Sequence, residues 1–330
     1  MKLSILDQAP IAQGQTAREA LETAIGLAQL GDQLGYERYW IAEHHDLFGL
    51  ACSNPSVMLS AIGSKTEKIR IGAGAVLLPY YQPFHVAETY NLLATLYPNR
   101  VDIGLGRAPG GSAEVSLALV DNYLQEVGKF PEKITTLEQF LTGTMPEESM
   151  YAQVTPTPVP EVSPSLWILG TSEKSAFLAA EKGLSYAFGH FMTSEEGPKI
   201  VQTYRDAFSP ATNKSPYVIG AIEVVCADST AEAARIAMSS LLWKIKQNKQ
   251  ATDLTIPTIK EAENYPFTTE ELEKIERMKQ KMVIGNPQEV KEKMLALQVD
   301  YEADEWMVIT STHDPNHTYR SYELLKEMWT

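Results

Sequence analysis

The chain has 330 residues, with 28 Lys and Arg against 42 Asp and Glu, which gives a formal net charge of −14. This charge excludes nucleic acid as a partner bound through a basic face, and it disfavours docking on anionic lipid membranes. Hydrophobic residues make up 44% and charged residues 21%, which is typical of a soluble globular protein and not of a disordered, collagen-like or coiled-coil chain.

Short apolar runs with the character of buried strands recur along the whole chain. Each run is four to ten residues long, carries β-branched or aromatic residues and is bounded by turn or helix signals. Eight such strands are predicted, over residues 2–6, 38–42, 69–78, 101–105, 166–170, 185–188, 217–226 and 305–310.

Helical patterns separate these strands. Apolar residues recur at helical spacing, and some segments also carry end signals: Gly183 as a left-handed stop, and Pro287 as a first helical residue behind the cap Asn286. The predicted helices cover residues 17–34, 85–96, 175–182, 231–245 and 289–298.

The alternation of strand and helix is typical of parallel βαβ units. The first four strands begin near residues 2, 38, 69 and 101, a spacing close to one βα unit. Eight units fit a (β/α)8 TIM barrel better than a doubly wound sheet, which usually has fewer strands. We therefore expect one α/β barrel domain over residues 1–330.

Two intervals are too long for a single helix. One covers about residues 113–165 and is rich in proline in its second half, and the other covers about residues 244–282 and is rich in Lys and Glu. Both are expected to be insertions over the catalytic rim. For the charged stretch 260–282, a solvated helical decoration without a functional part is the favoured alternative.

The two cysteines, Cys52 and Cys226, are too few for a disulfide framework and fit a reducing compartment. The first apolar stretch ends at Asp7, which is too short for the core of a signal peptide. No run approaches the roughly 18 apolar residues that a membrane span needs. We expect a cytoplasmic protein.

In a barrel of this kind the active site lies at the carboxyl ends of the strands. This rule selects the residues that directly follow six of the predicted strands. They are Asp7 and Gln8, then Glu43, His44 and His45, then Leu78 to Tyr81, then Gly106 and Arg107, then Thr171 and Ser172, then Gly189 and His190.

Three titratable side chains, Glu43, His44 and His45, follow directly on a buried strand. A histidine at a barrel mouth can give or take a proton near neutral pH. A metal site is an alternative, but neighbouring residues on an extended chain point apart, and no second cluster has zinc spacing, so no metal is expected. A pair that is hydrogen-bonded at the rim for structural reasons is the other alternative.

Residues 102–111 carry several glycines but fail as a dinucleotide fingerprint, because the third glycine position is Pro109 and no helix opens there. Gly104 and Gly106 instead let a flat ligand approach the backbone, and Arg107 offers a fork suited to phosphate. A rim arginine paired with a surface carboxylate is an equal alternative from this segment alone.

Residues 170–176 end a strand and open a helix. Free backbone N–H groups there, with the hydroxyls of Thr171, Ser172 and Ser175, form an anion site. The alternative is ordinary N-capping by Thr171 or Ser172. Together with Arg107 on the neighbouring strand, this helix start favours a pocket for one phosphate, and hence a phosphorylated planar cofactor.

At these segments the chain resembles the bacterial luciferase-like flavin monooxygenases, above all the luciferase alpha subunit and its bacterial relatives of unassigned substrate. The resemblance covers most of the chain except the two insertions. Its blocks are residues 40–45, 48–50, 54–55, 72–79, 91–93, 99–107, 170–176, 179–184 and 284–290.

The resemblance implies a (β/α)8 barrel that binds reduced FMN as a cosubstrate. Reduced FMN reacts with O2 to give a C4a-hydroperoxyflavin, which would oxidise a small organic substrate. A separate flavin reductase would supply the reduced FMN, and a homodimer is the usual assembly in the family. Deazaflavin-dependent hydride transfer and non-catalytic flavin binding occur among relatives and are the two alternatives.

The resemblance also assigns roles to residues. The family's histidine near the isoalloxazine falls on His44, with His45 beside it, and both are catalytic candidates. A non-proline cis peptide that contacts the flavin falls between Gly74 and Ala75. The family's phosphate ligands fall on Arg107, Thr171, Ser172 and Ser175.

Two features depart from the luciferase alpha subunit. A cysteine precedes the phosphate-binding arginine there, whereas this chain has Gly106, so chemistry tied to that thiol is not implied. The luciferase lid has no counterpart in the proline-rich stretch before the fifth strand. The resemblance therefore does not extend to light emission or to a long-chain aldehyde substrate.

Overall fold

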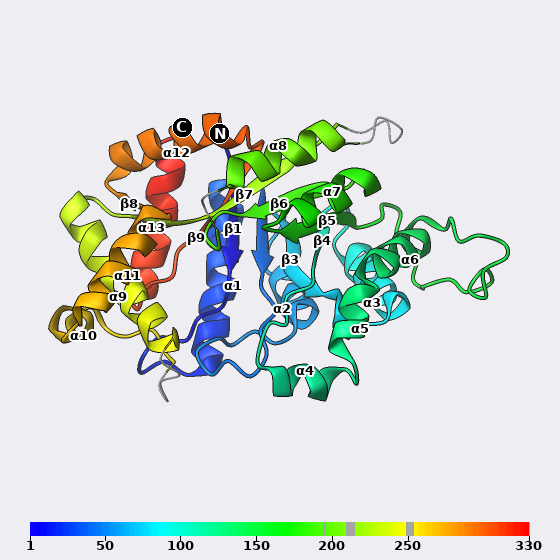
Figure 1. The fold of residues 1–330 in the computed structure, drawn as a ribbon, viewed down its shortest axis with the longest axis horizontal. Helices are drawn as coiled ribbons and strands as arrows, with labels where there is room; N and C mark the ends of the chain where they lie inside the picture. Colours follow the sequence, from blue (N-terminus) through cyan, green and yellow to red (C-terminus); the bar gives the residue numbers. More distant parts are fainter. Residues whose placement is uncertain (194–195, 209–214, 249–253, 330) are drawn as a thin grey trace.

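Eight parallel strands close into a barrel in the computed structural model, which describes residues 1–193, 196–208, 215–248 and 254–329 (Figure 1). Around the barrel the strands follow the order β1, β2, β3, β4, β5, β6, β7, β9, and β9 pairs with β1 to close the ring. Their bounds are β1 Lys2–Asp7, β2 Arg38–Ile41, β3 Arg70–Leu77, β4 Val101–Gly106, β5 Ser165–Gly170, β6 Ser185–Gly189, β7 Val218–Cys226 and β9 Glu305–Ile309. The predicted TIM barrel is confirmed.

A ninth strand, β8 (Met282–Gly285), lies outside the ring and was not predicted. β7 is nine residues long, and only its first part, as far as Glu223, pairs with β9. Residues 223–226 run past the ring and pair with β8 instead. Four residues give no usable periodicity, which is why the sequence pattern did not show this strand.

Helices surround the ring, and all five predicted helices are present. Their ends follow the sequence signals: Gly183 adopts φ 61°, and the Asn286 side chain accepts from the N–H groups of Gln288 and Glu289 at the start of the helix that begins with Pro287. No described helix is long and apolar enough to cross a membrane. The helices are α1 Ala17–Leu34, α2 Pro55–Gly63, η1 Leu78–Tyr80, α3 Pro83–Leu96, α4 Ala113–Leu119, α5 Tyr123–Gly128, α6 Phe130–Thr142, α7 Glu173–Lys182, α8 Gly197–Ala207, α9 Thr230–Asn248, α10 Ile259–Asn264, α11 Thr269–Gln280, α12 Pro287–Tyr301 and α13 Pro315–Glu327.

Alternation along the strands separates two hydrophobic layers. One set of side chains faces the helices and forms the large outer core, for example Ile5, Tyr39 and Ile103. The alternate set fills the barrel itself. This inner set comprises Leu6, Trp40, Trp167, Ala187, Ile219, Ala221, Met307 and Ile309, with Leu169, Phe191 and Tyr217 packed against it.

The amino end of the barrel is closed by buried charges. Arg38 contacts Asp102 at 2.8 Å and Glu305 at 2.7 Å, and its guanidinium lies 4.7 Å from the centroid of the Trp167 ring. Arg70 reaches the other oxygen of Asp102. Burial opposes ionisation of Asp102, but the two guanidinium groups outweigh it and hold the pKa of this carboxyl below its ordinary value. These inward-facing residues form the floor of the barrel.

The first predicted insertion divides into two parts. Helices α4 and α5 follow β4, and Figure 1 shows α4 at the end of the barrel toward which the strands run. Residues 143–164 instead follow α6 and lead into the amino end of β5. They pack on the flank, where Asn91 of α3 donates to the carbonyl of Pro156 at 2.9 Å, in place of the rim position expected from the sequence.

Among its described residues, the second predicted insertion contributes a short segment to the rim. Residues 254–258 lie along the loop after β1, where Ile256 exchanges backbone hydrogen bonds with Ile11 and Gln13. The carbonyl of Leu254 also accepts from the indole of Trp243 in α9. The charged helix α11 packs against α9 and β8 on the flank, which agrees with the alternative of a helical decoration.

Candidate functional site

The mouth of the barrel, at the carboxyl ends of the strands, is lined by small residues on β3, β4 and β6. Deeper in the barrel the inward positions hold Trp40, Trp167 and Met307. Beyond this bulky layer the inward positions are small on three strands, with Ala75 on β3, Gly106 on β4 and Gly189 on β6, while β5 and β9 carry Leu169 and Ile309. The change from large to small side chains leaves a shelf suited to a flat ring.

The bond between Gly74 and Ala75 is a cis peptide, at the position that the sequence resemblance indicated. The ladder between β3 and β4 shifts here, because Gly74 pairs with Gly104 and Val76 pairs with Leu105. Ala75 is therefore the extra residue of a bulge and turns into the mouth.

Two glycines of β4 are needed for packing around this bulge. A Cβ on Gly104 would lie 2.3 Å from the carbonyl oxygen of Ala73, and a Cβ on Gly106 would lie 2.9 Å from the Cβ of Ala75. Gly104 therefore admits a neighbouring strand, a role that the sequence analysis had given to a ligand. Gly106 keeps the shelf beside Ala75 flat.

His44 is mostly buried at this mouth, and no described residue partners its Nδ1 atom. Burial and the neighbouring His45 lower the pKa of His44 to about 4. The imidazole is therefore neutral at physiological pH. A buried nitrogen without a partner is costly unless a bound molecule satisfies it, which makes His44 the best-supported candidate for contact with a ligand.

His45 differs from His44 because a buried carboxylate holds it. Its Nε2 lies 2.9 Å from Oε1 of Glu43, an oxygen that also accepts from the Tyr81 hydroxyl at 2.7 Å. The other oxygen of Glu43 accepts from the backbone N–H of Leu77 at 3.1 Å. This network agrees with the alternative in which the second histidine is fixed at the rim by hydrogen bonds.

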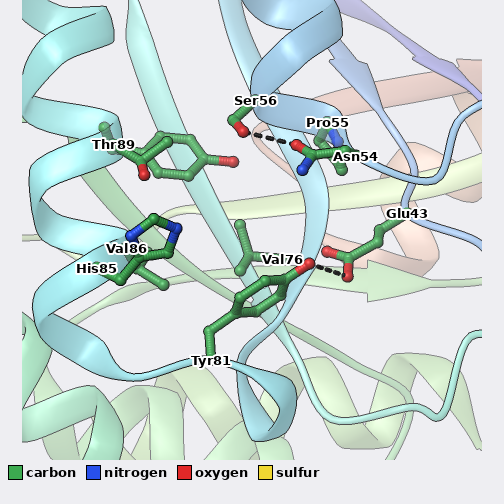
Figure 2. A pocket seen from close by; sticks show the side chains of 10 residues that line it. Glu43, Asn54, Pro55, Ser56, Val76, Tyr81, His85, Val86 and Thr89 are labelled. Carbon is green, nitrogen blue, oxygen red and sulfur yellow. Dashed lines mark hydrogen bonds between the residues drawn. The ribbon is translucent and has the colours of Figure 1, made fainter. Parts of the chain in front are cut away.

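Glu43 and Tyr81 also reach a cavity on the outer side of the barrel wall (Figure 2). The start of α2 supplies Asn54 and Ser56, and α3 supplies His85 on the opposite side. Since this cavity lies between the wall and two helices, it is separate from the mouth where His44 is located. Glu43 therefore acts as a link between the two sides of the wall.

Two further candidates from the sequence do not face the mouth. Asp7 is buried and accepts from the Tyr39 hydroxyl at 2.6 Å, and burial raises the pKa of its carboxyl. His190 is buried with Nδ1 2.7 Å from the hydroxyl of Tyr301 in α12, and burial, with the charge of Lys281, lowers its pKa. Both are satisfied inside the protein, which indicates structural roles.

The guanidinium of Arg107 has no hydrogen bond or ion pair with any described residue, so the alternative of a surface ion pair finds no support there. Arg107 follows Gly106 at the end of β4. The last pair of the β4–β5 ladder joins Leu105 to Ile168, which places Arg107 level with Gly170 at the start of the loop before α7. The two segments therefore lie side by side.

The loop before α7 forms a capping box. Ser172 is the N-cap and accepts from the N–H of Ser175, and the Ser175 hydroxyl accepts from the N–H of Ser172 and lies 3.0 Å from the Tyr186 hydroxyl. The expected N-capping is thus present. The next two N–H groups, of Glu173 and Lys174, have no acceptor among the described residues and remain available to an anion.

The structure therefore brings His44, the Gly74–Ala75 bond, Gly106, Arg107, Thr171 and Ser172 to one end of the barrel. Ser175 lies beneath the loop, engaged with neighbours, and is 6% exposed. No group of three or more His, Cys, Asp and Glu among the described residues is arranged to hold a metal ion. An anion site beside a flat shelf and a neutral imidazole suits a planar phosphorylated molecule.

Sequence reasoning missed three residues that support this mouth. Tyr80 and Tyr123 hold the loop after β4, and Lys133 of α6 donates to the carbonyls of Pro79 and Tyr81. Tyr80 was within a candidate range but carried no assigned role. Tyr123 and Lys133 lie in the first insertion, where no sequence motif marks them.

The chain is similar to known proteins over most of its length. A model of the luciferase-like monooxygenase family matches residues 1–301. The Bacillus subtilis protein YceB is 41% identical over 99% of each chain, and the N-acetyl-S-alkylcysteine monooxygenase of B. subtilis is 31% identical over 99% of this chain and 98% of its own. Among solved structures, apo-MsnO8 has a TM-score of 0.90 at 33% identity, covering 99% of this chain and 98% of that chain. An F420-dependent secondary alcohol dehydrogenase, with a TM-score of 0.69 and 15% identity over 99% of this chain and 97% of that chain, is similar in fold alone.

Proposed function

The chain belongs to the luciferase-like monooxygenase family, and from this premise we propose that it is a monooxygenase that uses reduced FMN and O2 to oxidise a small organic substrate. One observation carries the proposal. The guanidinium of Arg107 and the buried Nδ1 of His44 both lack a hydrogen-bond partner among the described residues, and both residues lie at the same glycine-walled mouth.

The residues present fit reduced FMN. Arg107 and the N–H groups at the start of α7 would hold the phosphate, with Thr171 and Ser172 beside them. The shelf at Ala75 and Gly106 would accept the ring system. When bound, reduced FMN supplies the electrons that activate O2. His44 would hold or move a proton at Nδ1, and the rim segments α4, α5 and 254–258 would exclude water.

The proposed function is tested by mixing the protein and photoreduced FMN with aerated buffer in a stopped-flow instrument. We expect a transient species whose absorption maximum lies at a shorter wavelength than the band of oxidised flavin. Its lifetime should be longer than that of any transient formed by free reduced FMN. Direct return to oxidised flavin at the rate of free reduced FMN would contradict the proposal and would favour non-catalytic flavin binding.

A second candidate function is hydride transfer with a deazaflavin coenzyme, favoured by the shared fold with the F420-dependent alcohol dehydrogenase. Both coenzymes carry a planar ring and a phosphate, so the mouth alone does not separate them. Parallel titrations with reduced FMN and with F420 distinguish the two. Tight binding of F420, with weak binding of reduced FMN, would favour this second function.

Loss of the Arg107 guanidinium should weaken phosphate binding selectively. We expect Arg107→Ala to lower the affinity for reduced FMN by about ten- to a hundredfold, because a charge-assisted hydrogen bond is lost. Reduced riboflavin lacks the phosphate, so its affinity should change by less than about twofold. Anaerobic fluorescence titration measures both. An equal loss for the two flavins would remove the phosphate role from Arg107.

Assembly, flavin supply and location complete the proposal. A separate reductase would supply reduced FMN, and the protein would act in the cytoplasm as a homodimer. Exposed apolar side chains on α2 and α3, namely Val57, Leu92 and Leu96, give the homodimer a surface to bury. Light scattering from the purified chain tests the homodimer, and a monomer at all concentrations would contradict it.

A further inference from the structure

Three donors hold the backbone of the loop that carries Arg107. The Tyr123 hydroxyl donates to the carbonyl of Arg107 at 2.7 Å, and the Tyr80 hydroxyl donates to that of Pro109 at 2.6 Å. The backbone N–H of His45 donates to the carbonyl of Gly110 at 2.8 Å. Ala108 and Pro109 are exposed, so at these residues the path of the loop depends on the hydrogen bonds of its backbone.

Tyr123 is itself anchored to the barrel. It is the first residue of α5, and Glu126 in the same helix pairs with Lys133 of α6 at 2.6 Å. Lys133 is buried and donates to the carbonyls of Pro79 and Tyr81 around η1. The first insertion is thereby attached to the end of β3.

Aromatic rings continue this connection toward the mouth. The Tyr123 and Tyr80 rings lie 5.2 Å apart between centroids, with 32° between their planes. The Tyr80 ring in turn lies 5.8 Å from the imidazole of His45, edge to face. The attachment of α5 through Glu126 and the contact with the Tyr80 ring therefore both restrain Tyr123, and its hydroxyl has a defined position.

We propose that Tyr123 is a positioning residue that presents the Arg107 guanidinium to the phosphate of the bound flavin. This inference rests on the proposed function. The guanidinium has no partner of its own among the described residues, so its direction depends on the backbone of Arg107, and Tyr123 fixes the carbonyl of that residue. Without the hydroxyl, the loop would have to be ordered when the phosphate binds, at a cost in affinity.

Tyr123→Phe tests this role because it keeps the ring and removes the hydroxyl. Tyr97→Phe is a matched control, since the Tyr97 hydroxyl also donates to a backbone carbonyl, that of Ser60 at 2.7 Å, away from the mouth. We expect Tyr123→Phe to weaken binding of reduced FMN about fivefold and to leave reduced riboflavin within about twofold. Tyr97→Phe should change neither affinity.

The outcomes separate this inference from the proposed function. A selective loss of affinity for reduced FMN in both Arg107→Ala and Tyr123→Phe supports the positioning role of Tyr123. Selective loss in Arg107→Ala alone, or an equal loss of both flavins in Tyr123→Phe, overturns the role of Tyr123 and leaves the phosphate site. Equal loss of both flavins in Arg107→Ala removes the phosphate site itself. If Tyr123→Phe does not fold, Glu126→Gln, which loosens the attachment of α5, should show the same selective loss, and unchanged affinities would overturn the inference.

Discussion

Replacing His44 by alanine should slow turnover strongly and leave flavin affinity nearly unchanged. The imidazole is neutral and buried, and its Nδ1 is not engaged by any described residue, so it is available to take or give a proton at the mouth. Proton transfer by a positioned side chain is worth about 10²- to 10⁴-fold in rate, and we expect a loss in this range for His44→Ala. Single-turnover kinetics with photoreduced FMN measure it.

A second histidine variant provides the control. His85 is exposed on α3 and lines the outer cavity (Figure 2), whose lining does not include His44. His85→Ala should keep the rate of the unaltered protein within about twofold. If His44→Ala loses flavin affinity as strongly as it loses rate, His44 is a packing residue and not a proton carrier.

Replacement of Arg38 should lower the free energy of unfolding far more than replacement of an exposed arginine. Arg38 lies between Asp102 and Glu305, and both carboxylates are fully buried. In Arg38→Met, Asp102 keeps Arg70 as its one cation among the described residues, and Glu305 keeps the hydroxyl donors of Ser4 and Tyr217. Breaking a buried ion pair in this way costs about 3–5 kcal/mol, which urea unfolding measures as a shift in midpoint.

The same variant predicts a dependence on pH. The pKa of Asp102 lies below its ordinary value, so its stabilising contribution is complete above about pH 4 and is lost only as the pH falls further. Arg38→Met removes one of the two cations that lower the pKa of Asp102, so the destabilisation should be larger at about pH 7.5, where this buried carboxylate is ionised, than at about pH 5.

Arg18→Met is the matched control for charge removal, because Arg18 pairs with Glu22 on the exposed face of α1. Its free energy of unfolding should change by less than about 0.5 kcal/mol. A cost below about 1 kcal/mol for Arg38→Met at both pH values would contradict the proposed importance of the floor.

The barrel could be predicted because its signals are local. Each ring strand is an apolar run with turn or helix signals at its ends, and caps such as Asn286 mark the helix starts. β8 and the course of residues 143–164 could not be predicted in this way. The first has four residues and pairs with a strand that overruns the ring, and the second is placed by contacts with α3 such as the bond from Asn91.

In the candidate site, sequence alone could place only the residues that directly follow predicted strands. His44 and Arg107 follow buried strands directly, so topology alone brings them to one mouth. Which side chains are already satisfied depends on tertiary contacts. The Ser175 hydroxyl lies within hydrogen-bond distance of the Tyr186 hydroxyl on the next strand. The Glu43 carboxylate is hydrogen-bonded to His45 and Tyr81. The bond from Tyr123 likewise depends on how the insertion folds back.

The closed floor has a consequence for the order of events in a catalytic cycle. Arg38, Trp40 and Trp167 fill the axis, so small molecules can reach the interior only from the rim. A flavin seated on the shelf at Ala75 would lie deeper than a substrate that arrives after it. The molecule that binds first would then be the last to leave. Steady-state kinetics should accordingly show an ordered mechanism. Reduced flavin would bind before the substrate, and the oxidised product would be released before the oxidised flavin.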